Sequence, residues 1–117
     1  KSDLVELFQA VGSQTLDQVS IELDDRAATT VMTVSGGYPE AYEKGKEITG
    51  LAAIDDSIIF HAGTKIQEGK VITNGGRVLA ITSYGSDFRT ALATSYKNVE
   101  KFNFDKMYYR KDLGFDL

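Results

Sequence analysis

RVLAITSYGSDFRTALATSYKNV, residues 77–99, places a strand, a turn and a helix in direct succession. Apolar residues run together in 77–83, as they do in a buried strand. Gly85, Ser86 and Asp87 then supply a turn and a helix N-cap, since an Asp carboxylate accepts hydrogen bonds from the free N–H groups of a first helical turn. Apolar side chains recur after the cap at helical spacing: Phe88, Ala91, Leu92, Tyr96 and Val99. The stretch predicts a strand followed by a long amphipathic helix.

The chain before this stretch adds one helix and several strands. Ser2 or Asp3 can cap a helix whose apolar residues follow at helical spacing and stop at Gly12, which predicts a short N-terminal helix. Strand patterns occur at 19–23, 28–34 and 57–61, and a hairpin pattern at 65–73. We therefore predict an α+β fold, a mostly antiparallel sheet of about five or six strands covered on one face by the long helix.

Composition bounds the class of protein. The 117 residues fit one domain, and a first residue that is Lys rather than Met indicates part of a longer polypeptide. A net charge of -4 with scattered basic residues argues against nucleic acid as a partner. No apolar run approaches the ~20 residues that a membrane span requires. The absence of cysteine excludes disulfides and thiolate metal sites, and we expect a soluble, cytoplasmic protein.

Three glycine-containing loops lie between the strand patterns. They are Ser35-Gly36-Gly37-Tyr38-Pro39, His61-Ala62-Gly63-Thr64 and Gly75-Gly76-Arg77. Glycine allows the backbone to approach a ligand or another loop closely, so we predict that the three loops form one binding wall. The alternative interpretation is that they are simple turns, with positive φ at glycine and an exit direction set by Pro39.

Several polar side chains in or near these loops have two interpretations each. Arg77 is suited to two-pronged binding of a phosphate, or to a surface ion pair, and Lys44 has the same ambiguity. His61 either faces a substrate or forms a hydrogen bond at the end of a strand. Arg110 and Asp112 are close enough in sequence to pair with each other, which favours a structural clasp there.

No catalytic or metal-binding residue is predicted within this chain. It contains neither a GxxxxGK[ST] loop nor a GxGxxG turn, and its single histidine supports no Ser-His-Asp arrangement. The acidic pairs at 24–25 and 55–56 lie beside turn residues, as solvated turns do. An aromatic group near the C-terminus is interpreted as packing, or else as a face that docks on other domains: Phe102, Phe104, Met107, Tyr108 and Tyr109.

Several motifs, in this order and spacing, resemble the C-terminal domain of the glycinamide ribonucleotide synthetase (phosphoribosylamine–glycine ligase) family over essentially the whole chain. They are KSDLV (1–5), VSGGYP (34–39), YEKG (42–45), ITGL (48–51), FHAGTK (60–65), GKVITNGGRVL (69–79) and YRKDLG (109–114). The ending at 109–114 also resembles the corresponding domain of biotin carboxylases, another ATP-grasp family. A non-catalytic binding module is the alternative from a different class.

The resemblance implies an ATP-grasp ligase of purine biosynthesis that joins phosphoribosylamine to glycine while ATP is cleaved to ADP and phosphate. ATP and magnesium would be bound mainly by preceding ATP-grasp and N-terminal domains, so the chain alone is expected to be inactive. Its expected part is to position small-molecule substrates. The residues predicted to do so are Gly36, Gly37, Tyr38, Lys44, His61, Gly63, Thr64, Gly76 and Arg77.

Overall fold

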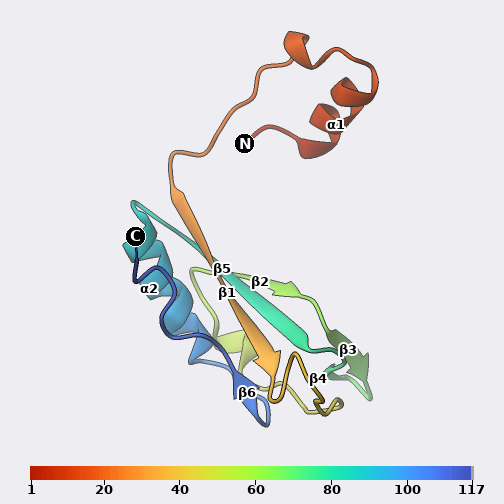
Figure 1. Cartoon of the computed structure of the whole chain (residues 1–117), viewed down its shortest axis with the longest axis vertical. Coiled ribbons are helices and arrows are strands. Elements are labelled where there is room, and N and C mark those ends of the chain that lie inside the picture. Colours follow the sequence, from red (N-terminus) through yellow and green to blue (C-terminus); the bar gives the residue numbers. More distant parts are fainter. Residues whose placement is uncertain (117) are drawn as a thin grey trace.

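A computed structural model describes residues 1–116, which form the α+β fold predicted from the sequence. The elements in chain order are α1 Leu4–Gly12, the 3₁₀ turn η1 Leu16–Gln18, β1 Ala27–Ser35, the 3₁₀ turn η2 Leu51–Ala53, β2 Ile58–His61, β3 Thr64–Gln67, β4 Lys70–Thr73, β5 Arg77–Gly85, α2 Phe88–Val99 and β6 Met107–Tyr108. Figure 1 shows α2 beside the sheet, and α1 projecting away from it. No helix among the described residues is both long and apolar enough to cross a membrane.

The strands are divided between two antiparallel sheets. A four-stranded sheet has the order β2-β5-β1-β6, and β3 pairs with β4 alone. The single sheet expected from the sequence is therefore split. The free edge of the hairpin is taken by a loop, because the Ile48 N–H donates to the carbonyl of Val71 at 2.9 Å and the Thr73 N–H donates to Lys46 at 2.8 Å. The predicted hairpin turn is confirmed at Glu68 and Gly69, which both have positive φ.

Helix α2 packs against β1 and β5, and apolar side chains between them form the core. Val31 on β1, Ile81 on β5 and Val99 on α2 are fully buried. Hydroxyl groups add a polar seam to this contact: Ser95 Oγ of α2 lies 2.9 Å from Ser83 Oγ of β5, which lies 2.7 Å from Ser57 Oγ. A buried polar group is stable only when it is hydrogen-bonded, so this seam fixes how α2 sits on the sheet.

Both predicted helix caps are confirmed. The Asp3 carboxylate accepts from the Val5 N–H at 2.7 Å at the start of α1. The Asp87 carboxylate accepts from the Thr90 N–H at 2.9 Å at the start of α2. The hydrogen bonds with Thr90 also lower the pKa of Asp87. These carboxylates satisfy N–H groups that have no partner inside the helix.

The C-terminal aromatic group is divided between core and surface. Phe102 and Phe104 belong to the buried core, which confirms the packing interpretation for these two rings and makes the docking interpretation wrong for them. Tyr108 is 60% exposed. The difference arises because Phe102 and Phe104 follow α2 directly and turn back beneath it, whereas Tyr108 lies in β6 at the edge of the sheet.

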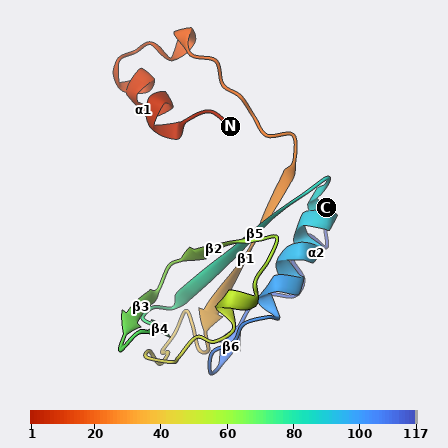
Figure 2. The same ribbon diagram turned by 180° about the vertical axis from the view of Figure 1, so that it is seen from behind.

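Residues 1–26 form an arm that lies outside the core. Both views show α1 and η1 carried away from the sheet on an extended segment (Figures 1 and 2). The strand predicted at 19–23 is wrong, because this segment has no neighbouring strand to complete a ladder. Its backbone bonds within the arm instead, where the Glu22 N–H donates to Ser2 Oγ at 2.7 Å.

We predict that Phe102→Ala destabilises the chain by about 3–5 kcal/mol, because the substitution leaves a cavity in the core. Phe8→Ala is the matched control: Phe8 is 65% exposed on the arm, so its truncation should change stability by no more than about 0.5 kcal/mol. Urea denaturation of the 117-residue chain measures both values. Equal effects of the two substitutions would contradict the assignment of Phe102 to the core.

Candidate functional site

The three glycine-containing loops meet at one end of the four-stranded sheet, and we call them the loop edge (35–39, 61–64 and 75–77). Loops 35–39 and 61–64 follow β1 and β2, and loop 75–77 leads into β5. Because β1 and β2 both run antiparallel to β5, the ends of the first two lie beside the start of the third. The structure therefore brings the predicted wall together in space.

Backbone hydrogen bonds join the three loops directly. The Ser35 N–H donates to the carbonyl of Gly76 at 2.8 Å, and Ser35 Oγ donates to the carbonyl of Gly75 at 2.9 Å. The Gly63 N–H donates to the carbonyl of Arg77 at 2.8 Å, and the Asn74 N–H donates back to Gly63 at 2.7 Å. The loop edge is thus one hydrogen-bonded unit.

Two of the glycines allow the loops to pack closely. A Cβ on Gly63 would overlap the carbonyl oxygen of Arg77 and lie 2.7 Å from the Cα of Gly75. A Cβ on Gly76 would overlap the ring of Tyr38, and Gly76 is buried. These residues shape the edge through contacts between loops, while Gly37 and Tyr38 are exposed at its surface.

Arg77 borders a cleft of about 230 Å³ at the loop edge. Tyr38, Tyr109 and Arg110 also line this cleft. In the part of the chain that the structure describes, Arg77 has no ion-pair partner, whereas Arg110 donates two hydrogen bonds of 2.9 Å to Asp112. The Arg110 guanidinium lowers the pKa of Asp112. The predicted clasp between Arg110 and Asp112 is confirmed.

Arg110 is the residue at this cleft that the sequence interpretation missed. The sequence favours a structural clasp with Asp112 over a ligand contact for Arg110, and its side chain both forms that clasp and lines the cleft beside Arg77. The motif at 109–114 contained the signal, because it places an aromatic residue and a guanidinium side by side. Only the fold shows that the C-terminal segment returns to the loop edge.

His61 and Thr64 border a second, shallow cleft of about 340 Å³. His61 Nδ1 lies 3.0 Å from Thr64 Oγ1, so the expected hydrogen bond at the end of the strand is present. Both interpretations of His61 nevertheless remain compatible with the structure, because the side chain is exposed and a hydrogen bond through Nδ1 leaves Nε2 directed elsewhere.

Lys44 lies in the loop that follows 35–39, in a group of charged side chains. Its neighbour Lys46 pairs with Glu43 at 2.6 Å and with Asp105 at 3.1 Å, and Lys106 pairs with Glu43 at 2.9 Å. Among residues 1–116, Lys44 itself has no ion pair, and the ion pairs with Glu43 are formed by Lys46 and Lys106. These ion pairs connect the loop to the turn that precedes β6.

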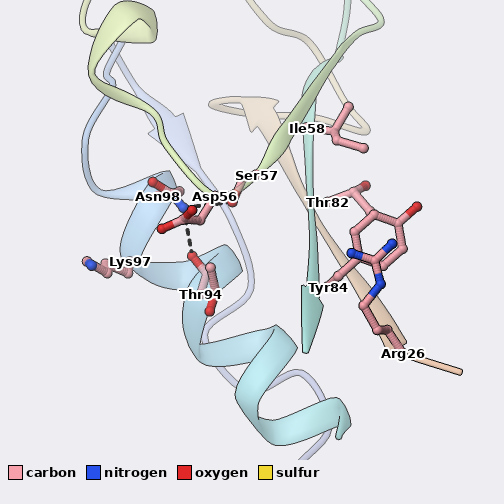
Figure 3. Close-up of a pocket in the computed structure, with 9 residues that line it drawn as sticks. All are labelled: Arg26, Asp56, Ser57, Ile58, Thr82, Tyr84, Thr94, Lys97 and Asn98. Carbon is pink, nitrogen blue, oxygen red and sulfur yellow. Dashed lines mark hydrogen bonds between the residues drawn. The ribbon is translucent and has the colours of Figure 1, made fainter. Parts of the chain in front are cut away.

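Another cleft, of about 670 Å³, is at a different place, between α2 and the outer part of β5 (Figure 3). Two of its polar groups are engaged: Arg26 stacks 4.1 Å from the Tyr84 ring centroid and bonds to Asp24, while the Asn98 amide donates to Ser57 Oγ at 2.7 Å. None of the residues predicted from the sequence to bind substrate lines this cleft, so we assign the candidate site to the loop edge, where most of them converge.

Metal ligands do not gather in the described part of the chain. No group of three or more His, Asp or Glu side chains within residues 1–116 is placed to hold an ion. The acidic pairs at 24–25 and 55–56 each contribute one carboxylate to an ion pair: Asp24 with Arg26, and Asp55 with Lys101. Both pairings lower the pKa of the carboxyl group concerned.

The fold and the loop edge define a class of protein: an antiparallel α+β domain that presents basic and aromatic side chains at one end of its sheet. The family described as phosphoribosylglycinamide synthetase, C domain, matches residues 28–116. The chain belongs to this family.

Its relatives are longer proteins. Phosphoribosylamine–glycine ligase of Synechocystis is 47% identical over 114 residues, which cover 95% of this chain and 27% of that protein. The trifunctional purine biosynthetic protein adenosine-3 of Gallus gallus is 48% identical over 98% of this chain and 12% of its own length. A crystal structure of phosphoribosylamine–glycine ligase from Thermotoga maritima matches 92% of this chain and 27% of its own with a TM-score of 0.74 and 35% identity. The chain thus spans about a quarter of the ligases it resembles, or less in the fused protein.

Glu43 gives the site a pH dependence. The Lys46 and Lys106 ammonium groups lower its pKa from an ordinary 4.5 to about 2. Because the pKa is depressed in the folded state, the ion pairs stabilise the loop fully above pH 4.5 and are lost as the pH falls toward 2. We expect the Glu43 carboxyl carbon to titrate in NMR spectra with a midpoint near 2. Lys46→Ala should raise that midpoint, and a wild-type midpoint near 4.5 would contradict the pairing.

Proposed function

We propose that this chain is the C domain of a phosphoribosylamine–glycine ligase and positions substrates for it. In that reaction a phosphoryl group passes from ATP to the glycine carboxylate, and the amine of phosphoribosylamine then displaces phosphate to form the amide. The observation that carries the proposal is the convergence of three glycine-containing loops around Arg77, in a chain 47% identical to a ligase of this name.

Arg77 is the residue to which we assign the phosphate group of phosphoribosylamine. A guanidinium binds phosphate through two parallel hydrogen bonds, and Arg77 borders a cleft without an ion-pair partner among the described residues. Tyr38 and Arg110 line the same cleft, so their side chains would border the bound sugar phosphate. Arg110 is held by Asp112, which keeps its guanidinium in place at the rim.

The other predicted residues fall into two roles in this proposal. Lys44, His61 and Thr64 offer polar groups to the glycine or to the amine substrate from the rim of the loop edge. Gly36, Gly37, Gly63 and Gly76 set the shape of the loops that carry those side chains. Such positioning accelerates a reaction between two bound molecules because it replaces a random encounter with a reactive geometry.

ATP and magnesium are assigned to other domains of the same polypeptide. The described residues do not fit a magnesium site, because no three acidic or histidine side chains gather there. The carboxylates of Asp24, Glu43 and Asp55 are instead paired with Arg26, Lys46 and Lys101. The relatives are about four times as long as this chain, so they have room for a further domain that supplies the nucleotide site. We place the whole enzyme in the cytoplasm, which agrees with a chain that has no cysteine.

We predict that the full-length protein forms glycinamide ribonucleotide from ATP, glycine and phosphoribosylamine, and that the 117-residue chain alone does not. Phosphate release coupled to product detection by mass spectrometry measures both. Bicarbonate-dependent carboxylation of biotin by the full-length protein, in place of this reaction, would contradict the proposal in favour of a biotin carboxylase. Turnover by the chain alone would contradict the placement of the ATP site.

In the full-length enzyme, Arg77→Ala should lower kcat/KM for phosphoribosylamine by roughly 10- to 100-fold, because charge-assisted hydrogen bonds to its phosphate are lost. The KM for ATP should stay unchanged. Arg89→Ala is the matched control, since Arg89 is exposed on α2 beyond the opposite end of β5. Steady-state kinetics test this, and an unchanged KM for phosphoribosylamine in Arg77→Ala would defeat the assignment.

A further inference from the structure

Helix α1 presents an uncovered row of apolar side chains. Leu4, Phe8 and Val11 are 59%, 65% and 56% exposed, and their spacing places them on one face of the helix. Ala10 is the one residue of α1 that is buried. Within the described chain this apolar row of α1 is therefore largely uncovered, although such a pattern normally faces a core.

The rest of the arm has the same character. Its other exposed large apolar residues are Val5, Leu16, Ile21 and Leu23. Hydrogen bonds of residues 1–24 stay within the arm, and Arg26 marks its junction with the sheet by stacking on Tyr84. Soluble domains rarely leave so many large apolar side chains exposed in so short a segment, so this surface indicates a partner.

The arm precedes the segment that matches the C-domain family, but the longer relatives also contain the arm. The family match begins at residue 28, directly after the arm, whereas the Synechocystis and Gallus gallus relatives align over 95% and 98% of the chain. Those alignments include most of the arm. The same relatives have about three-quarters or more of their length outside this chain. The arm thus occurs in polypeptides that contain further domains able to cover it.

Charge argues against a second copy of the arm as the partner. Six acidic residues lie in the arm: Asp3, Glu6, Asp17, Glu22, Asp24 and Asp25. Its basic residues are Lys1 and Arg26. Because the arm is strongly acidic, two arms packed face to face would repel each other. A domain on the same polypeptide also has an effective concentration of roughly millimolar, which favours it over a separate molecule.

We propose that α1 packs, through Leu4, Phe8 and Val11, into an apolar groove with basic flanks on a neighbouring domain of the same polypeptide. The arm then belongs to the core of that neighbour, and the junction at Arg26 connects the two domains. This docking is independent of which substrates the loop edge binds, because it uses a different surface at the other end of β1.

Hydrogen exchange of the full-length protein tests the docking. The amides of residues 4–12 should exchange at least about tenfold more slowly there than in the 117-residue chain, because docking protects the helix. Phe8→Glu in the full-length protein should abolish that difference. Gln9→Glu is the matched control, since it adds the same carboxylate at the next exposed residue, about 100° around α1 from Phe8 and away from the row of Leu4, Phe8 and Val11. It should keep the protection.

Equal exchange of α1 in the full-length wild-type protein and in the chain alone would overturn the proposal without any variant. A second result that overturns it is a full-length dimer that Phe8→Glu, but not Gln9→Glu, converts to monomers in sedimentation, since this would identify a second copy as the partner. Hydrogen exchange reports on structure and sedimentation reports on mass, and neither depends on enzymatic turnover. Failure of the ligase assignment would therefore leave their outcome unchanged.

Discussion

Antiparallel pairing of β1 with β5 is the constraint on which the rest of the structure depends. It runs from Ala27 opposite Gly85 to Val34 opposite Arg77, and it buries Val31 and Ile81 against α2. Since β2 also runs antiparallel to β5, three loops that are distant in sequence start or finish at the same end of the sheet. The loop edge is a geometric consequence of these pairings. Its hydrogen bonds from Ser35 to Gly76 and from Gly63 to Arg77 then stabilise the arrangement.

Charge is distributed unevenly over the molecule, and this distribution separates its surfaces. At and near the loop edge, Arg77 and Lys44 have no ion pairs among the described residues. Arg110, Lys46 and Lys106 are each paired with a carboxylate. These paired cations connect loops to neighbouring segments. At the other end of β1, the acidic arm combines carboxylates with exposed apolar side chains. The two ends of the sheet thus differ in charge and in exposed apolar surface, which is why we propose a small anionic substrate at one and a protein domain at the other.

The boundary between the arm and the sheet lies close to the start of the family match. The family match covers 28–116, which is the sheet with α2 and the C-terminal segment. That unit has its own core, from Val31 on β1 to Phe104 after α2. The arm contributes no residue to that core.

Local patterns in the sequence determined the elements whose stability is local: the capped helices at Asp3 and Asp87, the turn at Glu68-Gly69, and the buried strands 28–34 and 77–83. The resemblance to the family also came from the sequence alone. Tertiary structure decided what depends on partners distant in the chain. Residues 19–23 alternate like a strand but find no neighbouring strand, the hairpin 64–73 stays apart from the main sheet, and Arg110 returns to the cleft beside Arg77. Pairing and proximity are properties of two segments at once, so no pattern within one segment could reveal them.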